Sequence, residues 1–166
     1  LNGPSLYEEY LCQPLQDFLA SYWQKNYLTH SWLAGRTPER FYIGNQFCHN
    51  LFPTENQLFS IMDKMRSEGL EITLAFSYIR EFMLTSVGKL LEKVDNWCCI
   101  HGVNVEIVVN DWAVVEMLHG KTTRLCPVLG TLLNKRKKDP RMKYKSGDIS
   151  LFQRNSLNAK FYRDFL

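Results

Sequence analysis

Between Arg40 and Gly130 the sequence holds four short apolar runs that decide the fold: Phe41–Tyr42–Ile43, Ile72–Thr73–Leu74–Ala75–Phe76, Val105–Glu106–Ile107–Val108–Val109 and Leu125–Cys126–Pro127–Val128–Leu129. A glycine or a polar residue follows each run, and helical patterns separate them. Extended runs that alternate with helices are typical of parallel β-α-β units. We therefore expect an α/β fold with one parallel sheet, and any chemistry at the carboxyl ends of its strands.

Amphipathic stripes predict the helices between these runs. Apolar residues recur at three- and four-residue spacing, first at Leu58, Ile61, Met62 and Met65, and then at Val87, Leu90, Leu91, Val94 and Cys98. Thr54 and Gln57 form a capping box before the first of these helices. Asp111 is placed to cap a short third helix over 112–118.

The chain divides into an N-terminal helical extension over 1–40 and an α/β part over 41–166. Residues 5–24 carry a helical stripe that Pro14 interrupts, and Ser5 is a candidate cap. We expect Trp23, Tyr27 and Trp32 to be packing groups. The last segment, 156–166, has the pattern of a further helix, so that 41–166 would hold about four β-α units. This is half of a (β/α)8 barrel of the TIM type.

Length and composition indicate an ordinary globular chain. Its 166 residues fit one domain, with 45% hydrophobic and 22% charged residues. No apolar run approaches the roughly 20 residues of a membrane span, and acidic residues interrupt the first stretch, unlike a signal peptide. We expect no membrane partner and a cytoplasmic location. Because Leu1 is not an initiator Met, the sequence also fits a processed chain or a fragment.

Positive charge is concentrated near the C-terminus. From Lys121 onward there are 12 Lys and Arg against 3 Asp and Glu, a net charge of +9, although the whole chain carries only +3. Such asymmetry favours an anionic partner such as RNA or an acidic protein. A solvated basic face is the alternative.

The five cysteines predict neither a disulfide framework nor a closed zinc site, because their number is odd and no CxxC spacing occurs. We expect Cys12, Cys98, Cys99 and Cys126 to be core or helix-face residues. P-loop, GxGxxG, HExxH and GxSxG motifs are also missing from the sequence, which counts against a nucleotide-binding enzyme, a zincin and a serine hydrolase.

Three segments together resemble the N-terminal half of the collagenase-like peptidase family (peptidase family U-thirty-two). They are Tyr42–Ile43–Gly44–Asn45–Gln46–Phe47–Cys48, Val108–Val109–Asn110–Asp111–Trp112 and Gly130–Thr131–Leu132–Leu133–Asn134–Lys135. The resemblance implies a (β/α)8-type barrel. The family includes proteins named as peptidases, and RNA-hydroxylation and ubiquinone-biosynthesis proteins that hold an oxygen-sensitive 4Fe–4S cluster on four cysteines.

This resemblance implies a role for Cys48, which is similar in context to one cluster ligand of the ubiquinone-biosynthesis members. The other ligands of those members lie in the second half of the barrel, so a cluster here requires ligands from outside this chain. From its place after a strand, Cys48 is also a candidate metal ligand, and His49 beside it is a candidate base. The alternative for Cys48 is a partly buried small apolar group.

The remaining site candidates follow the strands. We expect a cleft built from the loops 45–50, 77–81, 110–112 and 130–136. Substrate-binding candidates are Asn110, Asp111, Asn134, Lys135 and Arg136, the last two as anion contacts. The alternative for Asp111 is a helix cap with Asn110 in the turn. The basic run 135–138 is also a candidate for contacts to a phosphate backbone.

Three functional hypotheses remain. The first is a peptidase-family half-barrel that takes part in an iron–sulfur-dependent hydroxylation or in peptide hydrolysis, with a second barrel half or another copy as its partner. The second is a non-enzymatic module that binds RNA or protein through its basic C-terminal segment. The third is an inactive truncated fragment, whose exposed edge strands would make it aggregate or dimerise.

Overall fold

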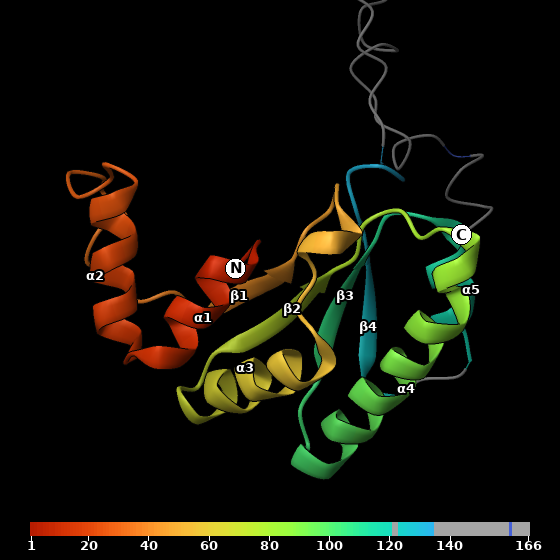
Figure 1. Ribbon diagram of the computed structural model, residues 1–166. Coiled ribbons are helices and arrows are strands. Elements are labelled where there is room, and N and C mark those ends of the chain that lie inside the picture. The colour runs from red at the N-terminus through yellow and green to blue at the C-terminus, as the bar shows by residue number, and fades with distance from the viewer. Residues whose placement is uncertain (121–122, 135–159, 161–166) are drawn as a thin grey trace, which may run out of the picture.

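The computed structural model describes residues 1–120, 123–134 and Lys160. At its centre is a four-stranded, all-parallel sheet with the strand order β1-β2-β3-β4 (Figure 1). The strands are β1 (Arg40–Gly44), β2 (Glu71–Ala75), β3 (Val105–Val109) and β4 (Leu125–Leu129). The alternation of strands and helices and the parallel pairing that the sequence predicts are therefore confirmed.

A helix connects each strand to the next. Helix α3 (Glu55–Ser67) follows β1, α4 (Leu84–His101) follows β2, and α5 (Trp112–Leu118) follows β3. Single 3-10 turns, η1 (His49–Leu51) and η2 (Glu81–Met83), precede α3 and α4. Because consecutive strands are neighbours in the sheet, right-handed crossovers place these helices on one face of it. Figure 1 shows α3 and α4 lying side by side across the sheet.

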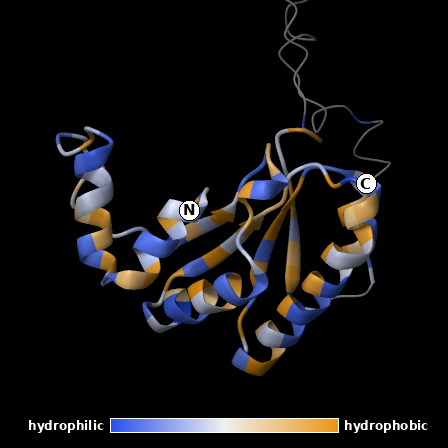
Figure 2. Cartoon of the chain, in the orientation of Figure 1, coloured by the Kyte–Doolittle hydropathy of each residue, from blue (hydrophilic) through white to orange (hydrophobic). Residues whose placement is uncertain are grey.

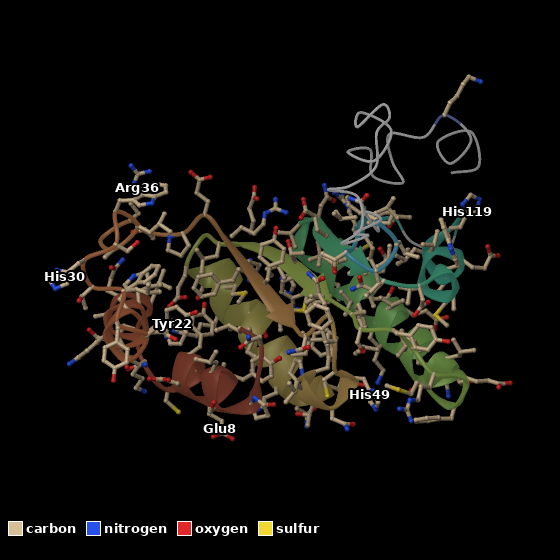
Figure 3. The ribbon with its side chains drawn as sticks, turned by 90° about the horizontal axis from the view of Figure 1, so that it is seen from above. Glu8, Tyr22, His30, Arg36, His49 and His119 are labelled. Carbon is tan, nitrogen blue, oxygen red and sulfur yellow. The ribbon has the colours of Figure 1, made fainter. Side chains whose placement is uncertain are left out.

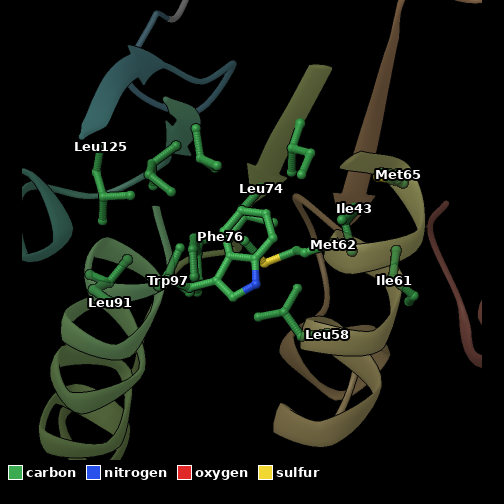
Figure 4. Close-up of a cluster of buried hydrophobic side chains, with 14 of the residues drawn as sticks. Ile43, Leu58, Ile61, Met62, Met65, Leu74, Phe76, Leu91, Trp97 and Leu125 are labelled. Atoms are coloured by element: carbon green, nitrogen blue, oxygen red, sulfur yellow. The ribbon is translucent and has the colours of Figure 1, made fainter. Parts of the chain in front are cut away.

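The core lies between this face of the sheet and the helices. Figure 4 shows it at the level of Trp97, Met62 and Leu58, which pack beneath Leu74. The predicted stripe of α3 is fully buried, and that of α4 is buried except at the partly buried Leu90. Apolar residues are also visible along the strands and the inner sides of the helices in Figure 2. Each fully buried side chain of this size contributes about 1.5–3 kcal/mol.

The opposite face of the sheet, here called the open face, carries polar side chains. Because side chains alternate along a strand, Arg40 on β1, Glu71 on β2 and Glu106 on β3 share this face, and Arg40 forms ion pairs with both carboxylates. Thr73 lies between them and donates a hydrogen bond to Glu106 (3.0 Å). The aromatic ring of Tyr42 and the side chain of Val128 on the same face are exposed.

The free edge of β4 contains a proline, Pro127. The amide of Gly130 donates to Val109 and the carbonyl of Arg124 accepts from Val105, so the backbone of the even-numbered residues of β4 faces β3. The odd-numbered residues, Pro127 among them, then face away from β3. Proline has no N–H to offer there. Within the described residues, no strand pairs with this edge.

The N-terminal extension consists of two helices. Pro14 ends the first, as predicted, and separates α1 (Pro4–Cys12) from α2 (Leu15–Lys25). The predicted cap at Ser5 is wrong, because α1 begins one residue earlier, after Gly3. The aromatic rings of Tyr27 and Trp32 are 93% and 73% exposed, so they are not packing groups as expected. Only Trp23 of that set packs against the core.

Helix α3 begins after Thr54 and helix α4 ends at Gly102, at the positions that the sequence predicts. Gly102 ends α4 in the left-handed conformation, with φ of 67°, which favours glycine. Thr54 is the N-cap residue of α3, but its side chain makes no capping hydrogen bond, so this half of the predicted capping box is wrong. The helix expected over 156–166 lies outside the described residues. Within the described part of the chain, every helix is too short or too polar to cross a lipid bilayer.

Candidate functional site at the carboxyl ends of the strands

Four loops meet at the carboxyl ends of the strands, and we call them the carboxyl rim. The rim comprises residues 45–50 after β1, 77–81 after β2, 110–112 after β3 and 130–134 after β4. Side chains on these loops bond to the loops of other strands, as described below. The structure therefore brings the described parts of the predicted cleft together.

Asn110 connects three of the strand ends. Its side-chain amide donates a hydrogen bond to the Phe76 carbonyl (2.7 Å), and its Oδ1 accepts one from the amide of Leu132 (3.1 Å). The residue is 3% exposed. Its side chain occupies the space beside Gly130, where a Cβ would lie 2.2 Å from Asn110 Oδ1. Asn110 is thus a buried tie between the loops that follow β2 and β4.

Asp111 uses both of its carboxylate oxygens for backbone contacts. Oδ1 accepts from the amide of Val114 (3.0 Å), which is the predicted N-cap of α5 and is confirmed. Oδ2 accepts from the amide of Ile79 (2.7 Å), across to the loop after β2. The charge is buried but meets two donors, and this compensates for the loss of water. These contacts fix the loop after β2 against the start of α5.

The loop after β1 is shaped by its own side chains. Asn45 Oδ1 accepts from the amides of Phe47 (2.9 Å) and Cys48 (3.0 Å), which is a turn that asparagine favours. Gln46 reaches the loop after β4, where the hydroxyl of Thr131 bonds to its side-chain oxygen (2.9 Å). Loops that follow the first and the last described strands therefore touch across the rim.

Cys48 is a free, partly exposed thiol on the rim, directly before η1. His49 follows it and lies edge-on to the ring of Phe82, with 6.5 Å between the ring centroids. His49 also lines a cavity of about 270 Å³ that includes Ser77 and the apolar residues Phe52 and Ile79. The histidine therefore has an apolar neighbourhood on one side, and Figure 3 marks its position in the molecule.

Of the predicted anion contacts, Lys135 and Arg136 lie outside the described residues. Asn134 is described, and its backbone amide donates to the Gly130 carbonyl (3.0 Å). Its side-chain Oδ1 is buried and has no hydrogen-bond partner within the described part of the chain. Asn134 is therefore held at the rim by its backbone.

Three exposed aromatic rings on or next to the rim are absent from the sequence-based candidates. Phe47 is 78% exposed, Tyr78 63% and Phe82 75%. Phe47 and Tyr78 lie shortly after β1 and β2, and Phe82 lies further on, in η2. For Phe47 and Tyr78 the signal is a large ring in a connection directly after a strand, because such loops lie on the surface.

Among the described residues, the other cysteines form neither a disulfide nor a metal-binding group with Cys48. Cys12 and Cys99 are exposed on helices and Cys98 is buried in α4, as expected, whereas Cys126 is exposed on β4, so the expectation of a core or helix-face position is wrong for Cys126. Burial raises the pKa of the Cys98 thiol to about 12. Among the described residues, no three Cys, His, Asp or Glu side chains are grouped to hold a metal ion.

Comparison with known proteins identifies no relative: no family model, curated protein or solved structure matches this chain.

Proposed function

We propose that this chain is one half of a (β/α)8 barrel of the TIM type, and that its carboxyl rim forms one side of a substrate-binding mouth similar to that of the collagenase-like peptidases. One observation carries the proposal: four parallel strands lie in consecutive order, with their loops bonded to one another at one end. A barrel has this order, whereas a doubly wound sheet reverses it at a switch point.

In this proposal the rim residues have two kinds of role. Asn110 and Asp111 are positioning residues, because their polar atoms hold backbone groups of the neighbouring loops. Cys48 and His49 are the residues that would face the mouth, and Asn134, on the loop after β4, is a candidate for substrate binding. Lys135 and Arg136, which follow Asn134 in the sequence, would contact an anionic group of the substrate.

A 4Fe–4S cluster fits the described residues only in part. They place one thiol, that of Cys48, on the rim, whereas such a cluster is held by four thiolates. The remaining ligands would come from outside this chain, from a second barrel half.

Anaerobic loading with sulfide and a mixture of ferrous and ferric iron, the two oxidation states that such a cluster combines, tests the role of Cys48. A small thiol such as 2-mercaptoethanol would supply the missing ligands. We expect bound iron and visible charge-transfer absorption in the wild type and in Cys12→Ser, and the loss of both in Cys48→Ser. Cys12 is a matched control because it is an exposed thiol on α1. Equal iron in wild type and Cys48→Ser overturns the assignment.

The exposed rings near the rim favour a second candidate, a module that binds single-stranded RNA. Phe47, Tyr78 and Phe82 offer stacking surfaces, and the sequence that follows the rim carries the basic run 135–138. Stacking on one aromatic ring contributes about 1–3 kcal/mol per base. Phosphate contacts add affinity that falls steeply with salt.

Fluorescence anisotropy with a labelled oligouridylate tests this candidate. Phe47→Ala should weaken binding by about tenfold, which corresponds to one lost stack. Tyr27→Ala removes an even more exposed aromatic residue, which belongs to the extension, and should leave the affinity unchanged. Equal effects of the two substitutions, or binding that does not depend on salt, would exclude the RNA-binding function.

A further inference from the structure

The cavity of about 270 Å³ beside His49 lies where the carboxyl end of β2 meets the starts of α3 and α4, and we call it the β2 pocket. Its lining comes from the segments 49–55, 76–83 and 86–90. All residues of these segments are described. The β2 pocket is therefore formed without either outer edge of the sheet and without the open face.

Two stacked aromatic rings give the β2 pocket a flat, fixed surface. The ring centroids of Phe52 and Phe76 are 4.7 Å apart, and the ring planes differ by 23°. Phe76 is 4% exposed and belongs to the buried cluster of Figure 4. Its carbonyl accepts a hydrogen bond from Asn110 (2.7 Å), and the amide of Ile79 donates to Asp111 (2.7 Å). These contacts hold the lining in place before a ligand enters.

The remaining walls are mainly aliphatic, and the volume suits a small ligand. They are formed by the side chains of Ile79, Met83, Val87 and Leu90. An apolar cavity of about 150 Å³ is sufficient to bind benzene, so the larger β2 pocket has room for two fused rings. A flat aromatic ligand also gains from offset or edge contacts with the phenylalanine rings.

One buried polar group in the lining, the hydroxyl of Ser77, receives no hydrogen bond. Ser77 is 5% exposed, and its hydroxyl donates to the carbonyl of the next residue, Tyr78 (3.3 Å). Within the described part of the chain, no N–H or O–H group donates to the Ser77 oxygen. A hydroxyl oxygen has two acceptor lone pairs, and a buried polar atom gains free energy when it finds a partner. The β2 pocket therefore favours a ligand with a donor.

The charge in the lining is already balanced. Glu55 is its one carboxylate, and both oxygens of Glu55 accept hydrogen bonds from Lys93 (2.6 and 2.8 Å). Among the described residues that line the β2 pocket there is no lysine or arginine to pair with an anionic ligand. A neutral ligand therefore fits this lining better than a carboxylate, a phosphate or an amine.

We propose that the β2 pocket binds a neutral molecule or group with two fused aromatic rings and one N–H donor, of which indole is the simplest. The rings lie against Phe52 and Phe76, and the N–H donates to the Ser77 oxygen. The site does not rest on the proposed function of the rim, because it requires neither a second barrel half nor a cluster.

An NMR titration of the full, isotopically labelled chain tests the proposal. The probes are indole and indene, which has a methylene group in place of the N–H. We expect both to bind and to shift the amide signals of Ile79 and Val87, which line the pocket. The signal of Gly102, at the other end of α4, should stay in place. Shifts confined to residues outside the lining overturn the proposal.

Two serine substitutions test the hydrogen bond. Ser77→Ala should weaken the binding of indole about fivefold, the effect of one hydrogen bond, and leave the affinity for indene unchanged. Ser86→Ala is the matched control, because Ser86 lines the same pocket but is exposed, and its hydroxyl donates to the Met83 carbonyl (2.8 Å). It should leave both affinities unchanged.

Circular dichroism of each variant confirms that it is folded. Any of three results overturns the proposal: no binding of indole to the wild type, equal effects of Ser77→Ala and Ser86→Ala on indole, or equal losses of indole and indene affinity in Ser77→Ala. If Ser77→Ala does not fold, the position of the shifted signals in the wild type decides.

Discussion

The two faces of the sheet are built from neighbouring residues of the same strands, yet they are held by opposite interactions. On the helix side, Ile43, Leu74 and Ile107 are fully buried in one apolar core. On the open side, Arg40 forms ion pairs with Glu71 and Glu106 in partial contact with water. Burial on the helix side therefore supplies most of the free energy of folding. Substitutions on the open face should cost less stability.

The largest expected effect on stability comes from truncating a buried side chain on the helix side, compared with a truncation on the open face. Leu74→Ala should lower the free energy of unfolding by about 2–5 kcal/mol, because it removes buried methyl groups and leaves a cavity. Val128→Ala, on the open face and 39% exposed, should cost less than about 1 kcal/mol. Urea unfolding followed by circular dichroism measures both. Similar losses on the two faces would contradict the comparison.

A smaller effect is expected at the rim, where the two faces meet. Asn110→Ala should cost about 1–3 kcal/mol, because the Phe76 carbonyl and the Leu132 amide lose their buried partner. Gly130→Ala should also destabilise the protein, since its methyl group would collide with Asn110.

A double-mutant cycle separates these two causes. Gly130→Ala should cost less in the Asn110→Ala background than in the wild type, because the side chain that it strikes is gone. Additive losses would mean that the glycine is required for its backbone and not for the space that it leaves.

On the open face, the expected effect depends on pH. The hydrogen bond from Arg40, more than that from Thr73, holds the pKa of the Glu106 carboxyl below its ordinary value. This contribution to stability is therefore complete above the unfolded pKa of about 4.3 and is lost as the pH falls through the lower, folded value.

Glu106→Gln should remove this part of the acid dependence, about 0.5–1 kcal/mol for a pair that is partly open to solvent. Thermal unfolding between about pH 7 and about pH 3, roughly one unit below the unfolded pKa, follows this loss. Glu92→Gln, on the exposed side of α4, should leave the acid dependence of the wild type intact. Parallel pH curves for wild type and Glu106→Gln would show that the ion pairs add nothing.

Cys98 and Cys99, which are adjacent in α4, compare a buried with an exposed thiol without any substitution. Cys98 is buried and its pKa is raised to about 12, first by burial, whereas Cys99 is exposed. Because the thiolate is the reactive form, iodoacetamide at neutral pH should alkylate Cys99 readily and Cys98 only when the protein unfolds. Peptide mass spectrometry with and without urea distinguishes them. Equal alkylation of the two in the native protein would mean that α4 opens freely at this turn.

Local patterns in the sequence predict most of the sheet and its helices. The stripe of Leu58, Ile61, Met62 and Met65 predicts the buried face of α3, and Pro14 predicts the break between α1 and α2. Asp111 predicts the start of α5. These features succeed because periodic burial, missing amide donors and caps act between residues that are close in the chain.

Contacts between distant segments are not predictable in this way. Asn110 looks like a turn residue in the sequence, and only the fold shows that it bonds to Phe76 and Leu132. Arg40 and Glu106 belong to strands on either side of β2, so their ion pair depends on register. The exposure of Tyr27 and Trp32 depends on how the extension folds back, and neither residue type nor spacing carries that information.

Pro127 has a consequence for how copies of this chain meet. A row of molecules that continue one another's sheets needs two receptive borders on each molecule, one for each neighbour. Pro127 removes one donor from the free edge of β4. Pairing with another copy is therefore disfavoured at this edge, and a ribbon of repeated copies would be weakest at each β4.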